Sequence, residues 1–326
     1  MGLFDKQISR KPNHYPQTQQ FIEAIQNGFW TAREFSFKAD YSQFKQLNEV
    51  EKGVVVRTLS AIGQIEVAVK KFWGELGNNL PHPSMVDLGY TMASNEVIHN
   101  EAYERLLTIL GLEGVFEENL KKDVVANRVK YLQKYLEKKY KDDRKQYVYA
   151  ICLFTLFVEN VSLFSQFYIM MHLNRFDNLF KDVAQQIQYT RNEEMLHAQV
   201  GIYLINTLKV EYPELFDEEL VQRIKEECQA AFEAESKVID WILQGYTNKH
   251  LSSPILKAYI KNRLNESMEQ IGFLKLEQTE EEVELVKQTY WMTEETLGSN
   301  MTDFFHKRPT EYAKNNKTFD LKDIFA

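Results

Sequence analysis

Two short motifs in the sequence combine the side chains that bind transition metals. Glu96-Val-Ile-His99 and Glu194-Met-Leu-His197 both follow the pattern Glu-x-x-His. On a helix, residues three apart lie on the same face, about one turn from each other. A carboxylate oxygen and an imidazole nitrogen of one motif can therefore reach the same ion. The motif is weak evidence by itself, so its surroundings decide the interpretation.

Two single glutamates stand out because the residues around them are apolar. Glu66 lies in LSAIGQIEVAV and Glu159 lies in ICLFTLFVENVSLF. Burying an unpaired carboxylate is costly, so such a residue is normally paired with a cation or bound to a metal. In chain order a lone Glu precedes each Glu-x-x-His motif, by 30 residues in the first case and by 35 in the second.

This order of residues predicts a dinuclear metal centre. Four helices that offer Glu, Glu-x-x-His, Glu and Glu-x-x-His form the di-iron or di-manganese site of ferritin-like bundles. Oxygen and imidazole ligands suit iron and manganese, whereas structural zinc would favour thiolates. We expect two metal ions per chain, held by Glu66, Glu96, His99, Glu159, Glu194 and His197. The alternative is that each Glu pairs with a buried Lys or Arg, and that each His is a hydrogen-bonded core residue.

The segments that carry these residues have helical patterns. Helices are predicted over 17–29, 48–78, 85–110, 117–140, 145–172, 177–208, 217–245, 253–275 and 280–297. Strand-like alternation is not sustained anywhere, and 13 Gly and 7 Pro are few for 326 residues. We expect an all-α fold, a ferritin-like long helical bundle over residues 1–300, followed by a polar, flexible tail over 301–326.

Composition and charge argue against several kinds of partner. The formal net charge of −8 does not suit a nucleic-acid binder, which usually has a basic face. Cys152 and Cys228 are too few and too far apart for a disulfide framework, which favours a reducing compartment. The start, MGLFDKQISRK, lacks the apolar segment of a secretory signal, and the most apolar stretch, 147–158, is too short to span a bilayer. We expect a cytoplasmic protein without nucleic-acid or membrane partners.

The motifs resemble those of the small, radical-generating (beta) subunit of class I ribonucleotide reductases, over nearly the whole chain. The stretches RTLSAIGQIE, NEVIHNEAY, LFVENVSLFSQF and RNEEMLH carry the resemblance. It implies that a dinuclear metal cofactor generates and stores an oxidising equivalent. That equivalent passes to a large (alpha) subunit and starts the reduction of ribonucleotides to deoxyribonucleotides. The resemblance also implies a homodimer that is active only with the large subunit.

Four further residues receive roles from the same resemblance. Tyr103, four residues after His99, corresponds to the radical-storing tyrosine, and Trp30 in GFWTAREF corresponds to the radical-relay tryptophan. Glu193 stands where the relay usually has Asp. Tyr312 in RPTEY corresponds to the tail tyrosine that passes the radical on, and the closing FDLKDIF resembles the peptide that docks on the large subunit. Without the metal site, Trp30 would be interpreted as a core residue and Tyr312 as a surface one.

Several positions depart from the common family pattern. The first ligand is usually Asp and is Glu66 here, the Arg of the relay is displaced to Arg191, and Leu163 replaces a Phe near the radical tyrosine although Phe167 is retained. With the GLFDK start and the KRPTEYAK tail, the chain most resembles a bacterial subclass with a dimanganese cofactor. In that subclass the oxidising equivalent stays on the metals. The resemblance thus favours Mn, with Fe or a mixed Mn/Fe pair as alternatives.

An alternative function keeps the metal site and changes the reaction. A ferritin-like di-metal oxidase or hydroxylase would use the same six ligands on a substrate of its own. It would need a substrate channel beside the metals, and it would not need Trp30 or a tail with apolar anchors. A storage protein would be shorter, and a scaffold would have no reason to bury Glu66 and Glu159.

Overall fold

The computed structural model describes residues 2–293, except for the side chains of residues 64 and 66–68. Its elements are α1 (Gln17–Asn27), α2 (Lys38–Gln46), α3 (Glu49–Gly74), α4 (Leu76–Asn79), α5 (Pro83–Leu110), α6 (Glu113–Leu120), α7 (Asp123–Leu132), η1 (Lys134–Leu136), α8 (Asp143–Leu153), η2 (Phe154–Ser162), α9 (Phe164–Asp177), α10 (Lys181–Glu211), η3 (Pro213–Leu215), α11 (Glu218–Leu243), α12 (Ser253–Gln270) and α13 (Glu280–Lys287). Within the described residues the only β pairing is one isolated bridge, between Asn248 and Leu251. The predicted all-α fold is confirmed.

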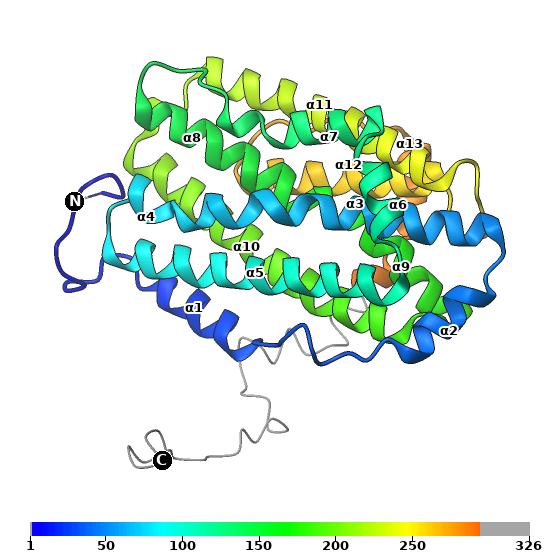
Figure 1. Ribbon diagram of the computed structural model, residues 1–326. Coiled ribbons are helices and arrows are strands. Elements are labelled where there is room, and N and C mark those ends of the chain that lie inside the picture. The colour runs from blue at the N-terminus through cyan, green and yellow to red at the C-terminus, as the bar shows by residue number, and fades with distance from the viewer. Residues whose placement is uncertain (1, 294–326) are drawn as a thin grey trace, which may run out of the picture. The chain divides into compact units, whose positions relative to one another are not determined.

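Four long helical segments make the centre of the bundle. In Figure 1, α3 and α5 run side by side, and the two helices are in contact. The third segment is the continuous run of α8, η2 and α9. The fourth is α10, which packs on α8, η2 and α9 and also on α5. Each of the four segments carries one or two of the predicted metal ligands, so the fold brings the four sources of ligands to one core.

The third segment changes its helical type in the middle. Residues 154–162 form a π-helix, in which each backbone N–H bonds to the carbonyl five residues earlier instead of four. Over Asp143–Asp177 the segment is long and apolar enough to cross a membrane. It is longer than the apolar stretch of residues 147–158 that the sequence analysis considered. Its most apolar window is 94% buried inside the protein, as expected for the core helix of a bundle.

A close contact joins α10 to the π-helix. Gly201 of α10 lies against Thr155 of η2, and a Cβ atom at position 201 would come within 2.0 Å of the Thr155 hydroxyl oxygen. Gly201 is four residues after His197, and Thr155 is four residues before Glu159. The absent side chain therefore lets the two helices approach each other one turn away from these residues.

Polar groups fix the ends of the ligand-bearing helices. The Asn48 side chain accepts hydrogen bonds from the first turn of α3, and Nδ1 of His82 accepts the Ser84 N–H at the start of α5. Gly111 ends α5 with a φ of 70°, as the sequence predicted. Asp40 of α2 accepts the backbone N–H of Val183 at 2.8 Å and thereby caps α10 from outside. These side-chain contacts therefore fix where α3, α5 and α10 begin.

Two parts of the chain differ from the expected helices. The short helix α2 was not predicted, and the segment 117–140 is not one helix but parts of α6, α7 and η1 separated by turns. Residues 2–290 belong to one compact unit. The predicted boundary at residue 300 and the predicted tail, 301–326, lie outside the described residues.

Candidate metal centre

Five of the six predicted metal ligands meet in the core. Glu96 and His99 come from α5, Glu159 from η2, and Glu194 and His197 from α10, and all five are buried. One oxygen or nitrogen atom from each of Glu96, Glu159, Glu194 and His197 lies within 4.8 Å of the other three. The sixth, Glu66, is in helix α3, and its side chain lies outside the described part of the structure. The cluster is a candidate metal site.

The polar atoms of this cluster are poorly satisfied by the described protein. Nδ1 of His197 lies 2.8 Å from Oε1 of Glu96 and 3.6 Å from Oε2 of Glu159. Even so, neither ring nitrogen of His197 and neither of those two oxygens makes a well-directed hydrogen bond within the described residues. Buried polar atoms normally have hydrogen-bond partners. Carboxylate oxygens and imidazole nitrogens that lie close together without such partners are what a bound metal ion would require. Carboxylate oxygens and imidazole nitrogens are ligands that suit Fe and Mn.

The two nitrogens of His99 face different groups. Nδ1 lies 3.2 Å from Oε2 of Glu96 and 3.1 Å from Oε1 of Glu194, so it points into the cluster. Nε2 lies 2.7 Å from Oε2 of Glu193, on the far side of the ring. A metal-binding histidine typically donates its other ring N–H to such a carboxylate, which fixes the orientation of the ring. Nδ1 is therefore the atom that can bind a metal.

Burial and mutual charge shift the pKa values of these groups strongly. Burial by itself disfavours the charged form of Glu96, but the charges and hydrogen bonds of His197 and His99 outweigh it and lower the Glu96 pKa to about 2. Burial, followed by the charges of Glu96 and Glu159, raises the pKa of Glu194 well above its ordinary value. Burial lowers the pKa of His197, yet the charge of Glu96 and the close approach of the Glu96 and Glu159 carboxylates raise it to about 9. Without a metal, protons on the imidazoles balance the carboxylates.

Trp30, which the resemblance names as a relay residue, lies next to this cluster. Its indole N–H donates to Oε2 of Glu193 at 2.8 Å, and Trp30 itself is 2% exposed. The Trp30 and His99 rings lie 6.1 Å apart with an interplanar angle of 27°. One carboxylate oxygen of Glu193 therefore joins the tryptophan to the histidine that faces the candidate metal site.

The structure describes Tyr103, Leu163 and Phe167, but not the predicted residues of the tail. The Tyr103 hydroxyl donates to the Thr190 hydroxyl at 3.3 Å, and Tyr103 is buried one turn beyond His99 on α5. Leu163 and Phe167 are both buried. Tyr312 and the FDLKDIF stretch lie outside the described residues.

Trp73 is a functional candidate that the sequence analysis missed. Its indole N–H donates to Oε1 of Glu159 at 2.7 Å, and its ring centroid is 6.2 Å from that of His197. A hydrogen bond to one carboxylate oxygen leaves the other oxygen, Oε2, to face the cluster. The sequence held little signal for this role, because Trp73 sits at the end of a helix whose rotation relative to η2 could not be predicted.

The fold and the cluster define a ferritin-like bundle with a carboxylate and histidine metal site in its core. The family model for the ribonucleotide reductase small chain matches residues 7–283. The chain belongs to that family, and it is a small (beta) subunit of ribonucleotide reductase.

Similarity to individual proteins is low in sequence and high in fold. The chain is 24% identical to a protein of Invertebrate iridescent virus 3 named "Probable ribonucleoside-diphosphate reductase small subunit 048L", over 95% of this chain and 85% of that protein. The ribonucleotide reductase R2 subunit from Clostridium botulinum superposes with a TM-score of 0.79 at 18% identity, covering 90% of this chain and 93% of that one. An R2-like ligand-binding oxidase with a Mn/Fe cofactor gives 0.69 at 19%, covering 80% and 96%. At these identities the two structures establish the fold.

Proposed function

We propose that this chain holds a dinuclear metal cofactor and delivers its oxidising equivalent to a ribonucleotide reductase large subunit through His99, Glu193 and Trp30. The observation that carries the proposal is the double contact at Glu193. Its Oε2 atom lies 2.7 Å from Nε2 of His99 and 2.8 Å from Nε1 of Trp30. An oxidase acting on its own substrate would have no use for a redox-capable indole joined to a metal ligand in this way.

The protein groups have separate tasks in this proposal. The metal pair, when bound, supplies a one-electron oxidant, which the side chains position and insulate. Glu66, Glu96, Glu159, Glu194 and the two histidines would hold the ions. Trp30 gives up an electron toward the site, and its N–H proton has Oε2 of Glu193 as acceptor at 2.8 Å. Since Trp30 is buried, water does not compete for that proton.

We further propose that manganese is the preferred metal. The donor set suits both Fe and Mn, so the preference rests on the resemblance of Glu66, the GLFDK start and the KRPTEYAK tail to the dimanganese subclass. Fe and mixed Mn/Fe pairs are the alternatives. Metal analysis and electron paramagnetic resonance on chains loaded separately with Mn and Fe decide between them, because only the preferred ion should yield an active subunit.

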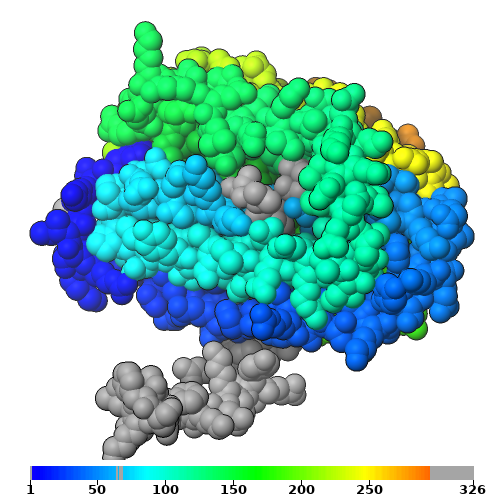
Figure 2. All heavy atoms as spheres, in the orientation of Figure 1, coloured from blue at the N-terminus to red at the C-terminus, as the bar shows by residue number. Residues whose placement is uncertain are grey.

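The partners in this proposal are a large subunit and a second copy of the chain. The tail offers Phe319, Leu321, Ile324 and Phe325 as apolar anchors in a polar segment, which suits a peptide that orders on binding. For the homodimer, α5 crosses the face seen in Figure 2, and its outward side exposes Tyr90 (65%) and Val97 (54%). These residues are seven apart and lie on one side of the helix, so they are candidates for the dimer interface.

A reconstitution assay tests the function. The purified chain, loaded with Mn and activated with superoxide or peroxide, should reduce no nucleotide by itself and should support reduction when a cognate large subunit is added. A chain truncated after Tyr312, which lacks residues 313–326, should lose affinity for the large subunit and keep its metal content. Oxidation of a small substrate by the chain alone, with no gain from the large subunit, would instead support the oxidase.

A further inference from the structure

The π-helix that presents Glu159 receives hydrogen bonds from other helices. Where a helix changes between α and π turns, its regular ladder is interrupted, and its buried carbonyls need other donors. Side chains from α7 and α12 supply three such bonds: Tyr131 to the Phe157 carbonyl at 3.4 Å, Arg263 to the Asn160 carbonyl at 2.7 Å, and Arg128 to the Ser162 carbonyl. The backbone on both sides of Glu159 is therefore held from outside the helix.

Asn160, the residue directly after Glu159, is held at each of its side-chain polar atoms and at its carbonyl. Arg263 of α12 donates from Nε to the Asn160 carbonyl and from Nη2 to its Oδ1 at 2.8 Å. The Asn160 amide donates to the Ser267 hydroxyl, one turn further along α12. The Arg263 guanidinium also stacks over the Phe164 ring at 3.4 Å, which fixes the plane of its fork. This arrangement holds both the position and the rotation of the turn that carries Glu159.

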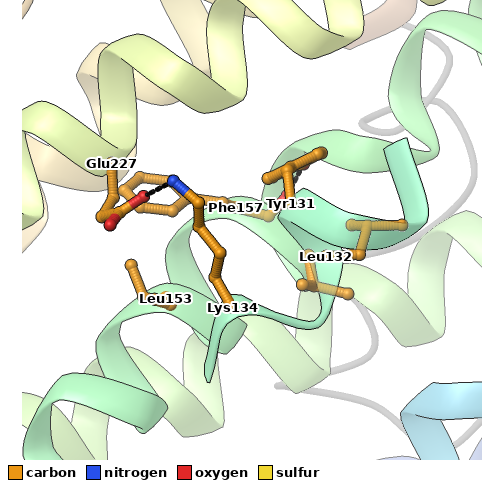
Figure 3. Close-up of a pocket in the computed structure, with 7 residues that line it drawn as sticks. Tyr131, Leu132, Lys134, Leu153, Phe157 and Glu227 are labelled. Carbon is orange, nitrogen blue, oxygen red and sulfur yellow. Dashed lines mark hydrogen bonds and ion pairs between the residues drawn. The ribbon is translucent and has the colours of Figure 1, made fainter. Parts of the chain in front are cut away.

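A small cavity lies between the π-helix and α7. A cavity of about 10 Å³, with room for a single water molecule, lies against Phe157 and Val158. Tyr131, Leu132 and Leu153 also line it, and the Lys134–Glu227 ion pair lies over it, as Figure 3 shows. Side chains leave this small space beside the π-helix unfilled, at the place where Tyr131 of α7 donates to the Phe157 carbonyl.

We propose that Arg263 is a positioning residue for Glu159. By holding Asn160, it keeps η2 in its π form and so sets the direction in which the Glu159 carboxylate enters the metal site. The inference rests on the proposed function, because it treats Glu159 as a metal ligand. Arg263 is a better residue to substitute than Arg128. Nε of Arg128 donates to the buried Glu235 at 2.9 Å. Removing Arg128 would leave that buried carboxylate unpaired and unfold the chain.

The test compares Arg263→Lys with a matched control, Arg57→Lys. Arg57 is also half-buried and also donates from Nε to a helix carbonyl, but that carbonyl belongs to Ile242 of α11, at 2.8 Å, and not to η2. Lysine keeps the charge at both positions and cannot span the Asn160 carbonyl and side chain together. A second variant, Asn160→Ala, removes the side-chain bonds to Arg263 and Ser267 without changing any charge.

Two measurements are made on the full-length chain. In the metal-free protein, amide hydrogen exchange of peptides covering 154–162 should become at least tenfold faster in Arg263→Lys, and less so in Asn160→Ala. Peptides of α11 should respond instead in Arg57→Lys. On titration with Mn(II), Arg263→Lys should bind one of two ions at least tenfold more weakly and change the resonance signal of the coupled pair, whereas Arg57→Lys should match the wild type.

The proposal is overturned if exchange over 154–162 and both Mn(II) affinities in Arg263→Lys equal those of the wild type. It is also overturned if Arg57→Lys changes them equally, since the effect would then be general destabilisation. Uptake of fewer than two Mn(II) ions by the wild type would count against the proposed function instead. The exchange comparison would still decide whether Arg263 holds the π-helix.

Discussion

Trp30 and His99 converge on one oxygen atom. Oε2 of Glu193 lies 2.8 Å from the indole nitrogen and 2.7 Å from Nε2 of the imidazole. Both contacts are buried, and the two rings lie nearly parallel. The carboxylate therefore orients the His99 ring and is placed to accept a proton from the tryptophan.

Glu193→Gln should separate these functions from metal binding. The amide can still accept hydrogen bonds but is no longer a base, so nucleotide reduction with the large subunit should fall by about 10² or more, the usual loss for a proton acceptor. Metal content should stay at two ions per chain. Tyr189→Phe is the control, because the Tyr189 ring packs 5.9 Å from Trp30 without joining the hydrogen-bonded path. Full activity in Glu193→Gln would remove Glu193 from the pathway.

Removing a ligand should weaken metal binding without weakening the metal-free fold. The pKa of Glu194 is raised by burial and by the charges of Glu96 and Glu159, so the site disfavours a third carboxylate charge. In Glu194→Ala the metal-free melting temperature should hold or rise, while at least one metal ion is lost. For the wild type, metal at about 100 times its dissociation constant should stabilise by about 2.7 kcal/mol. A large loss of metal-free stability in the variant would contradict this account.

Tyr103→Phe tests where the oxidising equivalent is stored. The Tyr103 hydroxyl donates to Thr190, and Glu66 in place of Asp with Leu163 in place of Phe led us to favour the metals as the store. After Mn loading and oxidation with peroxide or superoxide, the variant should keep the metal resonance signal and most of its nucleotide reduction. A sharp organic radical signal in the wild type, lost with all activity in the variant, would assign the storage to Tyr103.

The cap of α5 should make stability depend on pH. Burial, and then the neighbouring His14, lower the pKa of His82 below its ordinary value of 6.5. The unprotonated Nδ1 is also the atom that accepts the Ser84 N–H. The unfolded chain therefore binds the proton more readily, and this part of the stability is complete above pH 6.5 and lost as pH falls through and below it.

Urea unfolding of the metal-free chain at pH 7.5 and pH 5.5 measures this effect. His82→Asn keeps a good capping side chain without the titration, so its stability should change less between the two pH values. His82→Ala should lose about 1 kcal/mol at pH 7.5 and less at pH 5.5, where the wild type has already lost part of this stabilisation. Equal pH dependence in wild type and His82→Asn would show that His82 does not titrate with folding.

The sequence predicted the helical fold and five residues that the structure brings together, because both depend on local spacing. Residues three apart on a helix share a face wherever the helix lies, so Glu96 with His99 and Glu194 with His197 could be paired in advance. The π-helix around Glu159 and the role of Trp73 could not, since both depend on donors and neighbours supplied by distant segments. The short helix α2 was missed because its polar sequence has no apolar stripe, and its position depends on the contact of Asp40 with α10.

The contact between Gly201 and Thr155 limits how this site could change. Metal–ligand distances vary by only about 0.2 Å. At the Gly201–Thr155 contact the two helices leave no space for a methyl group, so adding one would move them apart by more than that. The contact lies one turn from His197 on α10 and one turn from Glu159 on η2. A side chain added at position 201 would therefore separate α10 from η2 beside the candidate metal site, so a residue with no functional group of its own bears on the spacing between His197 and Glu159.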